Sequence, residues 1–188
     1  MMPNLDFVTS VLRSQAQQAF DAGDAFGFLM SVESHKRMSL FALNYRQLRE
    51  RGIYEAALLE ALQSAKSNSR SWPLGLLKNW LQACDREKLL AAGDPLPHGG
   101  PFVLYRGVAG EPGHRRVCGI HWTGSLEKAI WFATRFHLPA PAVYRVRVEA
   151  ERVWAHNEYE DEYLVIIRRT GLQRVLWTFH GSERSQAG

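Results

Sequence analysis

The chain has 188 residues, of which 46% are hydrophobic, 22% charged and 11% aromatic. This composition excludes a disordered chain, and no apolar run approaches the roughly 18 residues of a membrane-spanning helix. The net charge of +4 permits an anionic ligand without requiring one. Two cysteines cannot form a disulfide framework, and the N-terminus lacks a basic signal segment, so we expect a cytoplasmic protein with no membrane association.

Helical spacing of apolar residues predicts that residues 1–96 form a helical region. The first helix follows a stripe over residues 5–20, and we expect Gly23 to end it and Asp24 to cap the next helix. Gly52 is expected to end the helix that follows, and residues 67–69 read as a break. The stripes of the later helices are Phe41, Tyr45 and Leu48; Leu58, Leu62 and Ala65; and, after a start at Ser71 and Pro73, Leu77, Leu81 and Cys84.

After residue 97 the spacing of the apolar residues changes. Short apolar or alternating runs predict strands over 102–106, 117–123, 143–148, 163–167 and 172–179, and helical spacing predicts one helix over 126–136. We therefore predict an α+β fold with a helical N-terminal region (1–96), a β-rich core (97–182) and a flexible tail (183–188). About 85 residues are few for an independent sheet domain, so we expect the helices to complete its core.

Two local features in the β-rich half could carry chemistry. Arg106 ends an apolar strand, and a buried arginine must meet an anion or a carboxylate; most such arginines are structural. Thr123 and Ser125 follow the second predicted strand, where their hydroxyl groups can bind a ligand. Either hydroxyl is equally a helix N-cap, with Glu127 in the first turn of that helix.

A third feature is the acidic run from residue 158 to 162, which directly precedes an apolar strand. On an extended chain Glu160 and Glu162 point to the same side, and such a pair suits proton abstraction together with stabilisation of a nearby cation. A solvated acidic turn is the ordinary alternative. Glu158 and Glu160 form a second pair of the same spacing, but we prefer Glu160 and Glu162 because the apolar strand starts immediately afterwards.

In this order, the arginine, the Trp-Thr-x-Ser step into a helix and the Glu-x-Glu pair resemble the ADP-ribosyltransferase superfamily, in particular its Arg–Ser–Glu branch, typified by arginine-modifying toxins. Residues 119–123, 129–133 and 153–155 also resemble small phage- and prophage-associated proteins. Their motif runs approximately YRG, then G-hydrophobic-S-W-T, A-x-x-F-A and E-x-E. The resemblance covers residues 102–168.

The resemblance implies a small split β-sandwich on which the helical part packs, with NAD bound as a substrate between two small β-sheets. It implies a mono-ADP-ribosyltransferase that cleaves the nicotinamide–ribose bond and passes ADP-ribose to a macromolecular acceptor, either a protein side chain such as arginine or a nucleic acid. The phage-like likeness suggests an effector or a toxin, whose partners would be a host target or an antitoxin.

Carried over to this chain, the resemblance makes Glu162 the catalytic glutamate and Glu160 the residue that orients or deprotonates the acceptor. Arg106 would hold the phosphates or the ribose of NAD, and Thr123 and Ser125 would support the nicotinamide ribose and orient the glutamate. Trp122 stands where the branch usually has the first serine of Ser-Thr-Ser, which leaves open which hydroxyl matters. The other residues expected to bind NAD or shape its pocket are Tyr105, Gly107, Trp122 and Phe132.

Other classes of function were weighed against this one. A catalytically inactive module on the same fold would bind a protein partner, or nucleic acid through the second half, where eleven of the twelve basic residues are arginine. A metal centre built from Cys118, His121, His114 and Cys84 does not follow a recognised zinc spacing, so we expect no metal. Cys118 and His121 would also face opposite sides of a strand, which disfavours a nucleophile pair.

Overall fold

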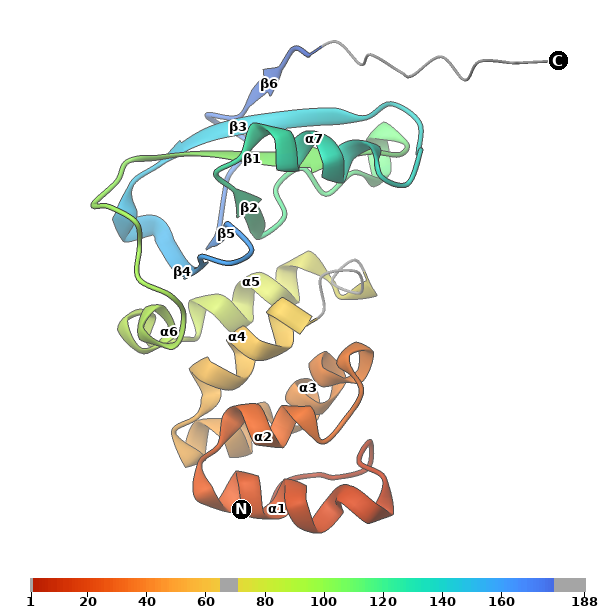
Figure 1. Cartoon of the computed structure of the whole chain (residues 1–188), viewed down its shortest axis with the longest axis vertical. Coiled ribbons are helices and arrows are strands. Elements are labelled where there is room, and N and C mark those ends of the chain that lie inside the picture. The colour runs from red at the N-terminus through yellow and green to blue at the C-terminus, as the bar shows by residue number, and fades with distance from the viewer. Residues whose placement is uncertain (1, 65–70, 178–188) are drawn as a thin grey trace, which may run out of the picture.

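A computed structural model describes residues 2–64 and 71–177. The first half is helical and lies against one side of a β-sheet formed by the second half (Figure 1). Two short 3-10 turns, Ser10–Leu12 and Ser34–Lys36, precede α1 and α3. The helices are α1 (Arg13–Ala22), α2 (Ala25–Met30), α3 (Arg37–Arg51), α4 (Tyr54–Ser64), α5 (Leu74–Gln82) and α6 (Arg86–Ala92).

The predicted helix ends agree with the structure where a cap determines them. Gly23 and Gly52 end α1 and α3 in the left-handed conformation, with φ of 75° and 79°, and Asp24 caps α2 by accepting the N–H of Gly27 at 2.9 Å. The predicted break over 67–69 lies outside the described residues. Helix α6 was not predicted, although Asp85 caps it by accepting two backbone N–H groups.

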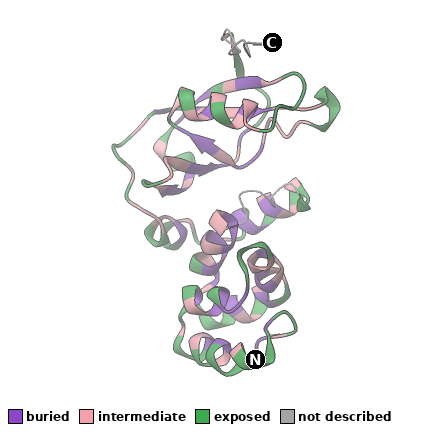
Figure 2. Ribbon diagram, turned by 45° about the vertical axis from the view of Figure 1, so that its right-hand side comes forward, coloured by how far each residue is buried: buried purple, intermediate pink, exposed green. Residues whose placement is uncertain are grey.

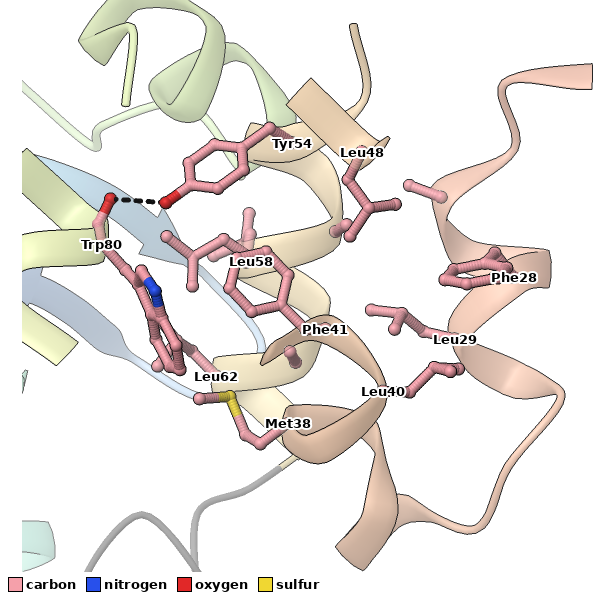
Figure 3. Packing of buried hydrophobic residues seen from close by; sticks show 14 of the residues in the cluster. Phe28, Leu29, Met38, Leu40, Phe41, Leu48, Tyr54, Leu58, Leu62 and Trp80 are labelled. Carbon is pink, nitrogen blue, oxygen red and sulfur yellow. Dashed lines mark hydrogen bonds between the residues drawn. The ribbon is translucent and has the colours of Figure 1, made fainter. Parts of the chain in front are cut away.

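The core of the helical half is built mainly from aromatic and leucine side chains, and Figure 3 shows its part between α2 and α5. Phe41 packs edge-on against Trp80, with 5.2 Å between ring centroids, and the Tyr54 hydroxyl donates to the Trp80 carbonyl at 3.1 Å. Two strand residues, Ala155 of β4 and Leu164 of β5, and Ile120 directly before β2 belong to the same buried cluster. The helices therefore complete the core of the sheet, as its small size predicts.

The second half forms one antiparallel sheet of six strands in the order β4-β5-β2-β1-β3-β6, with a single helix, α7 (Leu126–Thr134), in the chain between β2 and β3. The strands are β1 (Phe102–Val108), β2 (His121–Thr123), β3 (Ala142–Val148), β4 (Val153–Asn157), β5 (Glu162–Val165) and β6 (Gln173–Val175). The α+β class is thus confirmed.

Several predicted strand limits were wrong. The strand expected over 117–123 covers only His121–Thr123, because the residues before it turn to reach the sheet. Strand β4 was not predicted. The last expected strand, 172–179, is reduced to Gln173–Val175 among the described residues, and its end and the tail at 183–188 lie outside them.

Strands β1 and β2 are paired over a much shorter length than their neighbours in the sheet. Strand β1 pairs with β3 along its whole length, and β2 pairs with β5 along its whole length, but β1 and β2 meet at the single residue pair Tyr105 and Thr123. Where two small sheets were expected, the strands form one hydrogen-bonded sheet of two halves joined at this pair.

Helix α7 covers one face of β1 and β3, with its inner side buried and its outer side exposed (Figure 2). Ala129 and Ala133 pack on Val143 of β3. Gly107 of β1 is in direct contact with the helix backbone, since a Cβ there would lie 1.8 Å from the carbonyl oxygen of Ala129. The opposite face of the sheet carries its own buried cluster, which includes Leu104, Trp122 and Tyr163.

The acidic run forms the turn between β4 and β5, and only its last residue, Glu162, lies in a strand. Asp161 adopts a positive φ of 41° directly before β5 starts at Glu162. Among the residues that the structure describes, no helix is long and apolar enough to cross a membrane.

Candidate functional site

A pocket of about 210 Å³ lies where β1, β2 and the start of β5 meet beside α7. Eight of the predicted site residues line it: Tyr105, Arg106, Gly107, Trp122, Thr123, Phe132, Glu160 and Glu162. Ser125 is not among the lining residues. Residues far apart in the sequence meet here because β2 is inserted between β1 and β5 in the sheet.

Glu162 lies in a row of residues that crosses the three strands. It is paired with Thr123 of β2, which is paired with Tyr105 of β1, and cross-strand partners share a face of the sheet. His121 precedes Thr123 by two residues and therefore lies on that face too. Its Nδ1 atom is 2.8 Å from Oε1 of Glu162, and the two side chains are only 15% and 13% exposed.

Asp161 ties the turn between β2 and α7 to the turn between β4 and β5. Its carboxylate accepts the Thr123 hydroxyl at 2.5 Å and the backbone N–H groups of Gly124 and Ser125 at 3.2 and 3.0 Å. The Thr123 hydroxyl also accepts the Ser125 N–H at 3.1 Å. Thr123 thus bonds to Asp161 instead of to Glu162, in contrast to the orienting role expected for it.

Ser125 is a helix cap, the ordinary alternative considered for it. Its hydroxyl accepts the backbone N–H of Lys128 at 3.1 Å and donates to Oε2 of Glu127 at 3.0 Å. Hydrogen bonds from its own backbone N–H and from Ser125 hold the pKa of the Glu127 carboxyl below its usual value. The hydroxyl of Ser125 stabilises α7 and does not reach Glu162.

Glu160 and Glu162 are the acid pair of the pocket. The ammonium group of Lys128 donates to the backbone carbonyl of Glu160 and lies 3.6 Å from its Oε2. Glu158 is exposed and outside the pocket, and its backbone N–H donates to Asp94 at 2.8 Å. The structure therefore favours the pair Glu160 and Glu162 over Glu158 and Glu160.

Arg106 lines the pocket and also holds the loop that leads to β2. Its Nε donates to the carbonyl of Arg116 at 3.0 Å, and its Nη1 donates to the carbonyl of His121 at 2.5 Å. Gly119 leaves room for this guanidinium group, because a Cβ at residue 119 would lie 2.2 Å from Nη2. The arginine thus fixes the backbone of β2 beside the pocket.

Two expected pocket aromatics have different environments. Trp122 is 2% exposed, packs in the sheet core and donates its indole N–H to the Gly119 carbonyl at 2.8 Å, so it is chiefly a core residue. Its register partner Tyr163 lies in the same core, where burial, and then the charge of Asp161, raise the pKa of its phenol. Phe132 is half-buried at the pocket wall.

An aromatic and cationic rim borders the pocket at the C-terminal end of α7, where Phe132 was expected but Arg135 and Phe136 were not. The guanidinium carbon of Arg135 lies 4.6 Å from the ring centroid of Phe132 and 4.4 Å from that of Phe136. Both Arg135 and Phe136 line the pocket, and Phe136 is 59% exposed. A cation held over aromatic faces presents a surface suited to flat or anionic ligands.

Neither Cys84 nor Cys118 lines the pocket. Among residues 2–64 and 71–177, no group of His, Cys, Asp and Glu side chains is arranged to hold a metal ion. Burial, followed by the charge of Glu55, raises the pKa of the Cys84 thiol to about 12, and its sulfur donates to the Trp80 carbonyl. Cys84 is therefore a protonated core thiol at neutral pH.

Five pocket residues were not assigned to the site from the sequence: His121, Lys128, Arg135, Phe136 and Asp161. Asp161 stood out only as a member of the acidic run, and His121 only as a possible metal ligand. No protein-family model, no curated protein and no solved structure matches this chain.

Proposed function

We propose that this protein is an NAD-dependent mono-ADP-ribosyltransferase, which cleaves the nicotinamide–ribose bond of NAD and transfers ADP-ribose to a macromolecular acceptor. One observation carries the proposal. The three segments of the family resemblance, represented by Arg106, Thr123 and the pair Glu160 and Glu162, line one pocket. Each motif is ordinary by itself, but residues scattered over a core or surface would have no reason to converge on one cavity.

The size of the pocket suits one end of NAD. Its volume of about 210 Å³ is below the roughly 300–1,000 Å³ of sites that enclose a whole drug-sized ligand. The nicotinamide ring and its ribose would therefore occupy the cavity, and the adenylate would extend beyond it. The rim of Arg135, Phe132 and Phe136 offers charge and aromatic faces for a phosphate or a flat ring.

Glu162 would supply the main catalytic effect. When the bond between the nicotinamide nitrogen and the ribose carbon breaks, the electron pair leaves with nicotinamide, and positive charge develops on the ribose. The carboxylate of Glu162 stabilises that charge, and its low exposure of 13% strengthens the interaction by excluding water. A nucleophile of the acceptor then attacks the ribose carbon, and Glu160 takes the proton that it loses.

The acceptor and the setting are part of the same proposal. A protein arginine suits a Glu-x-Glu pair by analogy, and a nucleic acid suits the exposed arginines of the second half. The phage-like resemblance favours an effector or toxin. The free thiols of Cys84 and Cys118 suit a reducing cytoplasm. Among the described residues of the second half, the exposed arginines are Arg145, Arg147, Arg152, Arg168, Arg169 and Arg174.

The test uses NAD labelled in its adenylate, incubated with the protein and with cell lysate, purified RNA or purified DNA. We expect nicotinamide release and label on one macromolecular fraction. In Glu162→Gln both should fall by about 10²-fold or more, since the charge that faces the ribose is lost. Glu158→Gln is the matched control, because Glu158 lies in the same turn but outside the pocket.

The outcomes separate the classes of function. Release that persists in Glu162→Gln contradicts the site assignment. Release without label on any macromolecule contradicts transfer and indicates NAD hydrolysis. If the wild-type protein releases no nicotinamide under any of these conditions, the proposal fails in favour of a non-catalytic binding module.

A further inference from the structure

His121 faces the proposed catalytic carboxylate from the neighbouring strand. Its Nδ1 lies 2.8 Å from Oε1 of Glu162, a normal length for a hydrogen bond to a charged acceptor. The pair is inside the fold, since the side chains are 15% and 13% exposed. Both residues also line the pocket, so the imidazole lies beside the place where the ribose would bind.

Strand pairing and a hydrogen bond from the Arg106 side chain both hold the backbone of His121 in position. Strand β2 pairs with β5 through residues 121 to 123, which sets His121 diagonally across from Glu162. Arg106 donates to the carbonyl of His121 and so fixes the same residue from β1. A side chain anchored on a paired strand keeps its geometry better than one on a free loop.

The hydroxyl groups that the resemblance assigns to orienting the glutamate bond elsewhere. Thr123 donates its hydroxyl proton to Asp161, and Ser125 donates its proton to Glu127 while capping α7. A hydroxyl has a single proton to donate, so neither can simultaneously donate to Glu162 in this arrangement. The imidazole of His121, by contrast, lies within hydrogen-bond distance of Glu162.

We propose that His121 is the positioning residue of Glu162, a role that rests on the proposed ADP-ribosyltransferase function. The Nδ1–H group of a neutral imidazole donates to Oε1, holds the carboxylate in one orientation and leaves its negative charge intact for the ribose. In this role His121 contacts neither the nicotinamide–ribose bond that breaks nor the bond that forms to the acceptor.

The buried Nε2 atom of His121 favours this neutral form. Nε2 has no hydrogen-bond partner among residues 2–64 and 71–177. Protonation would bury an N–H donor at Nε2 without an acceptor, which costs free energy. In the Nδ1–H tautomer Nε2 carries only a lone pair, and burying a lone pair without a donor costs less. An imidazolium would also neutralise the charge of Glu162.

Other charged groups border the same pocket. Arg106 approaches from β1, Lys128 from α7, Arg135 from the C-terminal cap of that helix, and Glu160 and Asp161 from the turn before β5. Because replacement of His121 leaves these groups in place, a comparison of variants at this one residue isolates its effect.

Two substitutions test the role through kinetics. His121→Asn keeps a donor close to the position of Nδ1 but cannot titrate, and His121→Leu removes the donor while filling the space. For nicotinamide release, we expect His121→Leu to lower kcat about 10- to 100-fold with little change in KM, the usual effect of losing an orienting partner. His121→Asn should recover most of kcat.

A measurement independent of activity tests the pair itself. Nitrogen-15 NMR of the histidine rings should show His121 as the Nδ1–H tautomer with a slowly exchanging proton, and Glu162→Ala should abolish that protection. Glu158→Ala is the control and should leave it unchanged. Circular dichroism of His121→Leu confirms that this variant folds.

The possible failures are distinguishable. An Nε2–H tautomer in the wild type overturns the hydrogen bond, and equal kcat for His121→Leu and the wild type overturns the positioning role while leaving the proposed function intact. If His121→Asn is as slow as His121→Leu, the donor is not what matters. A wild-type protein that consumes no NAD overturns the function and this role together, whatever the NMR result.

Discussion

At the scale of single residues, Asp161 determines more of the site than its neighbours in the acidic run. It is the one acid of the turn whose carboxylate accepts a hydroxyl and two backbone N–H groups of another segment. Its positive φ of 41° turns the chain directly into Glu162. The position of the proposed catalytic carboxylate therefore depends on a neighbour that does not itself act on the substrate.

Replacement of Asp161 tests this dependence. Asp161→Ala leaves the hydroxyl of Thr123 and the N–H groups of Gly124 and Ser125 without their acceptor, so we expect a loss of about 1–3 kcal/mol in the free energy of unfolding. Urea denaturation measures it. Glu158→Ala, in the same turn but exposed, should stay within about 0.5 kcal/mol of the wild type. Equal stability of the two variants would show that the contacts of Asp161 are not important for folding.

At the scale of secondary-structure elements, the contact between β1 and α7 explains why a glycine follows Arg106. The helix backbone lies directly on Gly107, without a side chain between the two elements. This close approach brings Phe132 and Arg135 of the helical segment to the pocket that Tyr105 and Arg106 line from the strand. Arg106 therefore hydrogen-bonds to the backbone of β2, and the adjacent Gly107 allows the backbone of α7 to approach β1 closely.

Gly107→Ala is expected to be strongly destabilising. Its Cβ would lie 1.8 Å from a backbone carbonyl oxygen, so strand and helix must separate, and overpacking of this kind costs about 1–3 kcal/mol or more. Thermal unfolding followed by circular dichroism measures the change. The control is Gly75→Ala in α5, where a Cβ meets nothing within 4 Å and alanine favours the helix. A Tm for Gly107→Ala equal to that of the control would contradict the close packing.

At the scale of the whole molecule, the helical half and the sheet share one core and several backbone contacts. Leu164 of β5 is 2% exposed within the cluster of the helices. The N–H of Asp94 donates to the carbonyl of His156 at 2.9 Å, and Arg116 donates to the carbonyl of Trp72 at 2.7 Å. We infer that the helices support the strands that carry Glu162 and His121, and that the two halves fold together.

Cooperative unfolding of the full chain tests this inference. Leu164→Ala should cost about 2–5 kcal/mol, the usual effect of truncating a buried leucine. If the halves form one unit, hydrogen exchange should show equal losses of protection for amides in α4 and in β3. Val103→Ala, at a side chain 49% exposed on β1, is the control with little expected effect. Loss of protection in the sheet alone would show that the halves unfold separately.

Features that depend on neighbours along the chain could be predicted from the sequence. Gly23, Gly52 and Asp24 act within one turn of a helix, and the change from a helical to an extended period after residue 97 needs only local spacing. The same local pattern indicated Glu160 and Glu162 as the Glu-x-Glu pair nearest to an apolar strand, and both line the pocket.

Only the tertiary structure decided which side chains meet. The bond between His121 and Glu162 depends on the register of β2 on β5, and a shift of one residue would turn His121 to the other face. The binding of Thr123 by Asp161, and the restriction of β2 to three residues, likewise follow from contacts between distant segments. Spacing along a chain specifies local conformation, but partners across a sheet are selected by packing of the whole core, which no single segment contains.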